Sequence, residues 1–115
     1  MNVGKMASKK FIDNAGAAAA LLALLGNDKR LAIISHIIDN EMSVGEIAAK
    51  VSLSQSALSQ HLAKLRSLDL VETRRDRQMI FYCCRSDVVR TLLATLDELF
   101  GAGPQVERPL LRRSG

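Results

Sequence analysis

Residues 52–66 have the sequence SLSQSALSQHLAKLR, in which leucines recur at helical spacing among serine and glutamine and no acidic residue occurs. Leu58, Leu62 and Leu65 fall on one side of a helix, and this spacing predicts that they face a hydrophobic core. The opposite side then carries short hydroxyl and amide side chains instead of the glutamate and lysine of an ordinary solvated helix. The outward positions are Gln55, Ser56, Ser59, Gln60, Ala63 and Lys64.

Acidic residues are absent from a longer segment around this helix. From position 47 to position 68 the chain has no aspartate or glutamate. Basic side chains are kept there, namely Lys50, Lys64 and Arg66, together with His61. The whole chain of 115 residues, which fits a single domain, has a formal net charge of +4. This distribution of charge is compatible with a polyanionic partner.

The ends of the chain and its cysteines favour a cytoplasmic protein. The N-terminal sequence MNVGKMASKK is polar and basic, and no apolar run of a signal peptide follows it. The apolar stretch at 15–25 is too short to span a bilayer, so we expect a buried helix there and no membrane partner. The two cysteines are adjacent, which is incompatible with the disulfide framework of a secreted domain.

Apolar spacing and helix-end signals predict a mainly α domain with one small β-hairpin. Ser43 is a predicted N-cap, and Glu46 three residues later completes a capping box. A polar RRDRQ turn separates two segments that we expect to pair as strands 70–74 and 78–84. We expect five helices, at 13–25, 29–39, 44–51, from 54 or 55 onward, and at 87–100. The domain would span residues 11–100, between a flexible basic arm at 1–10 and a disordered tail at 101–115.

This order of elements is that of a winged helix-turn-helix, whose second helix enters the major groove of DNA while the hairpin tip reaches the adjacent backbone or minor groove. Glutamine can bond adenine through N6 and N7, and serine can bond base edges or phosphate. Lysine and arginine suit phosphate or a narrow minor groove. The predicted DNA-binding residues are Ser54, Gln55, Ser56, Ser59, Gln60 and Lys64 on the helix, and Arg75 and Arg77 on the hairpin.

Two segments resemble a known family. The sequences LGNDKRLAIISHI and EMSVGEIAAKVSLSQSALSQHLAKLRSLDLVETRRDRQMIFYCC, with the closing helix, are similar to the ArsR/SmtB family of bacterial repressors, and within it to the rhizobial nodulation-gene repressor branch and to virulence regulators. The resemblance covers roughly residues 15–100 and implies a winged helix-turn-helix homodimer, joined through the first and last helices, that represses from imperfect palindromic operators. The dimerisation residues would be Ala18, Leu22, Leu92, Leu96 and Leu99.

The same resemblance indicates that the metal sites of the family are missing. Many relatives bind metal through a Cys-x-Cys pair at the start of the third helix, where this chain has Ser43 and Gly45. A second family site uses aspartate and histidine on the last helix, where this chain has Asp87, Asp97 and Glu98 but no histidine. Because transition-metal sites need cysteine or histidine, we expect no metal and no cofactor.

Two alternatives to a simple repressor stay open. Cys83 and Cys84 could sense oxidants, and because the family pattern places Tyr82 and Cys84 inward, strand alternation predicts that Cys83 faces solvent. The fold could also be a dimeric interaction module without DNA binding, although such a module would be expected to admit acids into the helix at 54–66. No catalytic carboxylate pair, activated nucleophile or glycine-rich phosphate loop indicates an enzyme. The sequence does not specify a small-molecule inducer.

Overall fold

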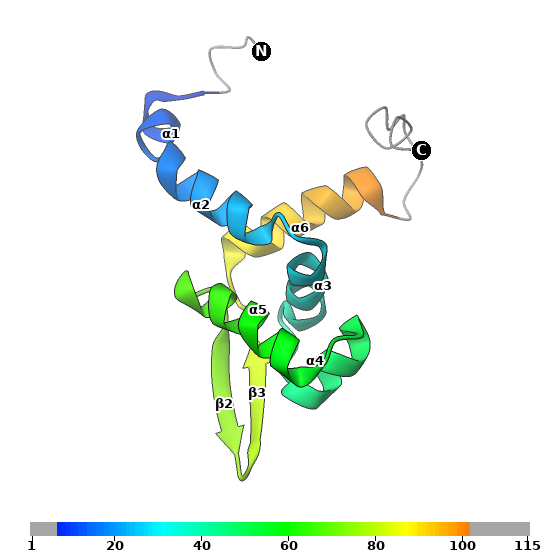
Figure 1. Cartoon of the computed structure of the whole chain (residues 1–115). Helices are drawn as coiled ribbons and strands as arrows, with labels where there is room; N and C mark the ends of the chain where they lie inside the picture. The colour runs from blue at the N-terminus through cyan, green and yellow to red at the C-terminus, as the bar shows by residue number, and fades with distance from the viewer. Residues whose placement is uncertain (1–6, 102–115) are drawn as a thin grey trace.

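The computed structural model describes residues 7–101 and shows a helical body from which a β-hairpin projects (Figure 1). Residues 1–6 of the predicted arm and 102–115 of the predicted tail lie outside this range. The described elements are α1 (Lys9–Asp13), α2 (Ala15–Leu25), α3 (Asp28–Ile37), β1 (Met42–Ser43), α4 (Val44–Val51), α5 (Gln55–Ser67), β2 (Glu72–Asp76), β3 (Met79–Cys83) and α6 (Asp87–Phe100).

The N-terminal helix is divided into two pieces, so the described range has six helices where five were predicted. The first piece, α1, begins at Lys9 instead of Asp13 because the Ser8 hydroxyl accepts a hydrogen bond from the Phe11 N–H at 3.0 Å and caps the helix. An ion pair between Lys9 and Asp13 supports this turn. Asn14, with φ −104° and ψ 13°, then separates α1 from α2.

Helices α3, α4 and α5 enclose the hydrophobic core. Asn27, Ser43 and Ser54 cap them, each side chain accepting a hydrogen bond from the N–H three residues later. The capping box predicted at the start of α4 is therefore confirmed. The predicted inward residues of α5 are at most 2% exposed. The core includes Ile33, Ile34, Ile37, Ile47, Val51, Leu58, Leu62, Leu65, Tyr82 and Val89.

The hairpin belongs to a three-stranded antiparallel sheet with the strand order β1-β3-β2, whereas only its two long strands were predicted. The additional strand, β1, has two residues that pair with Tyr82 and Phe81 of β3, and it leads directly into α4. A strand this short has no periodicity that sequence analysis can detect. Strands β2 and β3, which we call the wing, extend away from the helical body (Figure 1).

The prediction that Cys83 faces solvent was wrong. Both cysteines are buried, Cys83 with 3% and Cys84 with 0% exposure. The two cysteine side chains still lie on opposite faces of the strand, because Cys84 belongs to the main core together with Tyr82 whereas Cys83 does not. Strand periodicity gives the direction of a side chain but does not show whether its face is covered.

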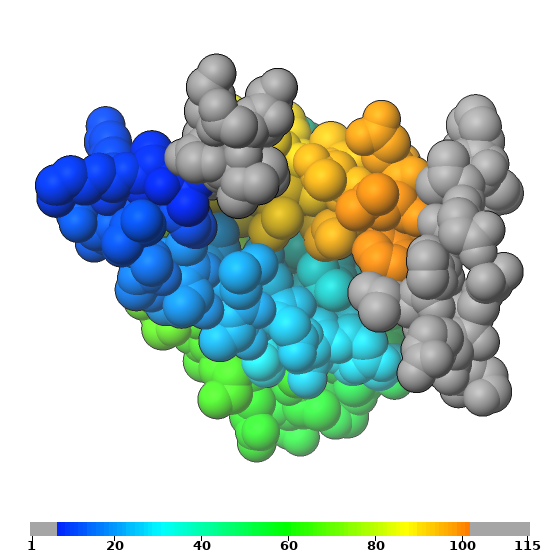
Figure 2. Space-filling view, turned by 90° about the horizontal axis from the view of Figure 1, so that it is seen from above, coloured from blue at the N-terminus to red at the C-terminus, as the bar shows by residue number. Residues whose placement is uncertain are grey.

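Helices α2 and α6 lie on the side of the molecule away from the wing (Figure 1). The view from above shows α2, α3 and α6 on one surface, with α1 projecting at one end (Figure 2). Helices α2 and α6 carry large apolar side chains that are exposed: Leu22 is 58%, Leu99 47% and Phe100 48% exposed. Among residues 7–101, no helix is long and apolar enough to cross a lipid bilayer.

Candidate nucleic-acid interface

The outward face of α5 consists of exposed polar side chains. Gln55, Ser56, Ser59, Gln60 and Lys64 are all exposed, and the leucines on the opposite face are buried. The helix contains no acidic residue that would repel phosphate. Because the buried face fixes the helix on the core, its amides and hydroxyls lie together on one exposed surface, where they can donate and accept hydrogen bonds.

The turn between α4 and α5 sets the direction of α5. Ser52 ends α4 in the left-handed conformation, with φ 56° and ψ 50°. The Ser54 hydroxyl accepts a hydrogen bond from the Ala57 N–H at 3.1 Å and so begins α5. This predicted DNA-binding residue therefore already serves as a helix cap, while its hydroxyl hydrogen can still be donated to a phosphate.

A groove of about 430 Å³ lies between α5 and the wing. Gln55 and Ser59 line it from α5, and Gln78, Ile80 and Tyr82 line it from the wing turn and β3. The fold thus brings together the first half of the exposed helix and the tip of the hairpin, as the winged arrangement requires.

The register of the wing places neighbouring arginines on opposite faces. Cross-strand partners share a face of the sheet, and Arg75 is paired with Ile80 whereas Arg74 is paired with Phe81. Since Ile80 lines the groove against α5, Arg75 lies on the α5 side of the wing and Arg74 on the outer side. Arg77 lies in the turn itself, with a left-handed φ of 61°.

The basic side chains form two groups. Arg74 and Arg90 each hold a carboxylate through two hydrogen bonds of 2.7–2.9 Å. Lys64, Arg75 and Arg77, in contrast, form no ion pair within residues 7–101. The cations predicted to meet phosphate, on α5 and on the wing, are thus among those that no described acidic side chain neutralises.

Two basic residues of α3 fix the helix-turn-helix to the body. The Lys29 ammonium donates to the Val51 carbonyl at the end of α4, at 2.8 Å. The Arg30 guanidinium lies 3.3 Å from Nδ1 of the half-buried His61 on α5. Sequence analysis missed both contacts because they join residues 22 and 31 positions apart. They hold the exposed face of α5 in one orientation.

The positions of the family's metal ligands have other roles in this chain. The Ser43 hydroxyl, in a residue 5% exposed, accepts a hydrogen bond from the Glu46 N–H at 3.2 Å. On α6, Asp87 pairs with Arg90. Across residues 7–101, no three histidine, cysteine, aspartate or glutamate side chains come together as metal ligands.

The buried thiols are poorly suited to rapid oxidation. Burial is the largest cause that raises the pKa of the Cys84 thiol above its usual range. A higher pKa lowers the fraction of reactive thiolate at neutral pH, and burial also limits access by an oxidant. These properties do not favour Cys84 as a thiol switch.

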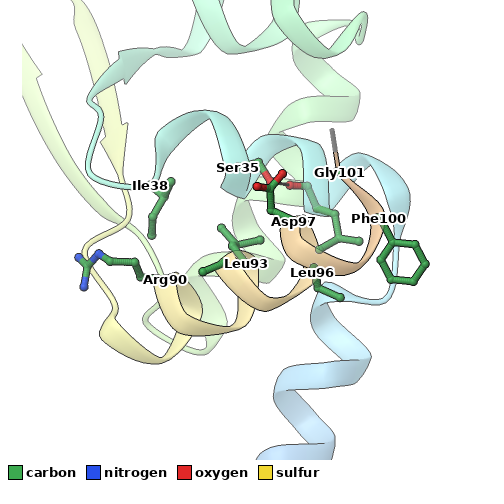
Figure 3. Close-up of a pocket in the computed structure, with 10 residues that line it drawn as sticks. Ser35, Ile38, Arg90, Leu93, Leu96, Asp97, Phe100 and Gly101 are labelled. Atoms are coloured by element: carbon green, nitrogen blue, oxygen red, sulfur yellow. Dashed lines mark hydrogen bonds between the residues drawn. The ribbon is translucent and has the colours of Figure 1, made fainter. Parts of the chain in front are cut away.

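A second hollow, of about 710 Å³, lies between α3 and α6. Ile38, the residue that follows α3, and Leu93 of α6 lie on its two sides (Figure 3). Leu96, a predicted dimerisation residue, also lines it. The other predicted dimerisation residues are exposed, in the case of Leu22 and Leu99, or half-buried, in the case of Ala18 and Leu92.

These features define a winged helix-turn-helix of the DNA-binding class. Residues 27–73 match the family model described as bacterial regulatory protein, arsR family. The chain is 47% identical over 104 residues to nodulation protein NolR of Rhizobium meliloti, covering 89% of this chain and 85% of NolR. It is 45% identical over 87 residues to the transcriptional activator HlyU of Vibrio cholerae, covering 76% and 81%. The crystal structure of NolR from Sinorhizobium fredii matches with a TM-score of 0.75 and 49% identity, over 84% of this chain and 96% of that one.

The chain belongs to the arsR family of bacterial regulatory proteins. It is a DNA-binding transcriptional regulator and not an enzyme. The family resemblance and the winged helix-turn-helix fold inferred from the sequence are thereby confirmed, with a sixth helix and a third strand added.

Proposed function

We propose that the chain is a homodimeric repressor that binds an imperfect palindromic operator in the bacterial cytoplasm. Each copy places its α5 in one of two successive major grooves, about one helical turn apart. The observation that carries this proposal is the acid-free, exposed polar face of α5 beside a wing whose tip carries unpaired arginines. Bound across a promoter, such a dimer excludes the polymerase.

The second copy completes the apolar surface of α2 and α6. Leu22 and Leu99 are about half exposed in the single chain, at 58% and 47%. Uncovered apolar side chains of this size on neighbouring helices are typical of an association surface. The proposed dimer interface comprises Ala18, Leu22, Leu92, Leu96 and Leu99.

The contacts divide into base recognition and phosphate binding. Gln55, Ser56, Ser59 and Gln60 meet base edges, because short amide and hydroxyl side chains can both donate and accept hydrogen bonds there. Ser54 and Lys64 bind phosphate on the α5 side. Arg75 and Arg77 reach phosphate or the minor groove beside the major-groove contact.

Selection from randomised duplexes tests this function and yields the preferred operator. Wild-type protein should enrich a palindrome with half-sites about one turn apart. Gln55→Ala removes one base contact from each half-site, so it should lower the preference for the selected site over random DNA by roughly 30-fold or more, the equivalent of two good base contacts of about 1–3 kcal/mol each. Fluorescence anisotropy at fixed salt measures both affinities.

Lys64→Ala provides the contrasting variant on the same helix. It removes a phosphate contact, so the affinities for selected and random DNA should fall by the same factor. The base-recognition role of Gln55 is refuted by an equal loss on both duplexes. The proposed function itself is refuted if wild-type protein enriches no sequence, or if a promoter reporter carrying the selected operator is unaffected by the protein.

A further inference from the structure

Arg74 crosses the whole sheet on its outer face. Its Nε and Nη2 atoms donate to the two carboxylate oxygens of Glu41 at 2.9 and 2.7 Å. Its guanidinium carbon lies 4.7 Å from the ring centroid of Phe81, the cross-strand partner of Arg74 on β3. The side chain therefore starts on β2, passes over β3 and ends beside β1, on the far edge of the sheet.

This contact joins the free edge of the wing to the segment that begins the helix-turn-helix. Glu41 directly precedes β1, and β1 runs without a break into α4 through its cap Ser43. Every residue of β2 is exposed, so core packing does not fix the position of this strand. The ladder to β3 holds β2 along one edge only, and the Arg74–Glu41 pair adds a second attachment.

The charge of Arg74 is already compensated where it lies. Two parallel hydrogen bonds to one carboxylate are the strongest arrangement that arginine forms with an acid. Hydrogen bonding by Arg74 is the largest cause that lowers the pKa of the Glu41 carboxyl, so the pair stays ionised at neutral pH. Arg74 thus differs from Arg75, which lies on the α5 side without an acidic partner in the described residues.

We propose that Arg74 and Glu41 are positioning residues, which fix the wing relative to α5 so that its tip meets the DNA that flanks each major-groove contact. The inference rests on the proposed DNA-binding function and adds a role to an acidic residue. The inference predicts that removal of the Glu41 carboxylate changes DNA affinity in the direction opposite to that expected from charge alone. Removal of a carboxylate strengthens DNA binding if only charge matters, because phosphate repulsion is reduced. Loss of a positioning carboxylate weakens binding instead.

The test compares Glu41→Gln with wild type on two duplexes. The full-length duplex is the selected operator with its flanking base pairs. The trimmed duplex keeps both α5 contacts and the base pairs between them but lacks the flanks. Glu41→Gln should bind the full-length duplex about three- to fivefold more weakly, the size expected of a well-formed exposed ion pair. On the trimmed duplex, which the wing does not reach, the two proteins should bind equally. A general loss of folding cannot produce this dependence on the flanks.

Two further variants complete the test. Glu72→Gln removes the same charge from β2, where the carboxylate pairs with Arg85 at 3.0 Å and not with the segment before α4. It should bind both duplexes as tightly as wild type or more tightly. Arg74→Lys keeps the positive charge but cannot form the two-pronged bond to Glu41, so it should reproduce the flank-dependent loss.

The inference is overturned if Glu41→Gln binds the full-length operator as tightly as wild type or more tightly, or if its loss is the same on both duplexes. It is also overturned if Arg74→Lys behaves as wild type. Failure of the proposed function is seen separately, because wild-type protein would then prefer no duplex before any variant is examined.

Discussion

The half of the chain that carries the proposed DNA-binding face and the half that carries the proposed dimer interface are packed to different degrees. In the first half, formed by α3, α4, α5 and the wing, core residues such as Ile34, Ile47 and Leu58 are 0% exposed. In the second half, formed by α1, α2 and α6, Leu25 and Val89 are the buried residues of the described helices. One copy of the chain therefore completes the first half and leaves the second half open.

This difference assigns separate tasks to the two halves. A closed core keeps the exposed face of α5 in a fixed orientation within one copy. In the proposed dimer, the open apolar surface of α2 and α6 sets how two copies join, and hence how far apart the two α5 helices lie. The proposal therefore makes operator spacing a property of this second half, although none of its residues needs to touch a base.

Introduction of a charge into the open half should have the largest effect. Leu99→Glu places a carboxylate in the proposed interface, where it would be buried without a partner. The dimer should dissociate, and affinity for the selected palindrome should fall by about 100-fold or more because the two half-sites are no longer bound together. Sedimentation velocity gives the oligomeric state, and anisotropy gives the affinity.

Thr91→Glu is the matched control for this prediction. It adds the same carboxylate to an exposed polar position of the same helix. It should leave the dimer and its operator affinity unchanged within a fewfold. The proposed division of the molecule is wrong if the Leu99→Glu protein sediments as a dimer with normal affinity.

A smaller effect should come from a change in the first half. Arg77→Asn removes the charge at the wing turn while keeping a residue that tolerates its φ of 61°. Each lost phosphate contact reduces the magnitude of the negative slope of log K against log salt by about 0.9. In a dimer with two such contacts, the magnitude of the slope should fall by about two. Binding to selected and random DNA should weaken alike.

Arg85→Asn lowers the net charge equally at the base of the wing, where the arginine pairs with Glu72. Its salt slope should equal that of wild type. A slope for Arg77→Asn that is also unchanged would place the wing turn outside the interface.

The smallest effect concerns the joint between the halves. Asp39, after the end of α3, accepts two hydrogen bonds of 2.7 Å from Arg90 of α6. Hydrogen bonding by Arg90 is the largest cause that lowers the pKa of this carboxyl. The ionised Asp39 carboxylate therefore stabilises the folded state, and this contribution is complete above about pH 4, the pKa of an unfolded aspartate. The contribution disappears as the pH falls through the lowered pKa of the folded state. Asp39→Asn should therefore have a slightly lower Tm at pH 7, and the difference should vanish at low pH.

Asp69→Asn is the control, because Asp69 has a similar left-handed φ of 56° but forms no ion pair within the described residues. Thermal unfolding followed by circular dichroism from pH 7 down to about pH 2 should show little difference in Tm between this variant and wild type at any pH. A Tm difference for Asp39→Asn that persists at low pH would show that the ion pair does not join the halves.

Sequence analysis succeeded where the signals are local. The start of α4 at Val44 follows from the capping box of Ser43 and Glu46, and α5 begins at Gln55, one of the two predicted starts. The spacing of the leucines on α5 gave the buried face and, by difference, the exposed one. The candidate site on α5 depends only on these short-range features, so most of it could be predicted.

The remaining features depend on contacts between distant parts of the chain. Strand β1 exists because Met42 pairs with Tyr82, and the ion pair between Arg74 and Glu41 joins residues 33 positions apart. Burial of Cys83 depends on what covers its face, which alternation does not reveal. The start of α1 was missed for another reason, since Ser8 caps a helix with no buried residue and hence no apolar period.

The serine cap of α4 has a consequence for how this regulator could evolve. A Cys-x-Cys pair of the kind that the family resemblance implies for many relatives would require cysteine at positions 43 and 45. A Cβ at position 45 meets no atom within 4 Å, so the fold has room for a side chain there. Loss of the Ser43 hydroxyl, however, removes a cap and destabilises the fold by about 0.5–2 kcal/mol. The two mutations are therefore unequal: cysteine is accepted at position 45 first, and only the later loss of the Ser43 cap has a cost, which metal binding by the completed pair would have to offset.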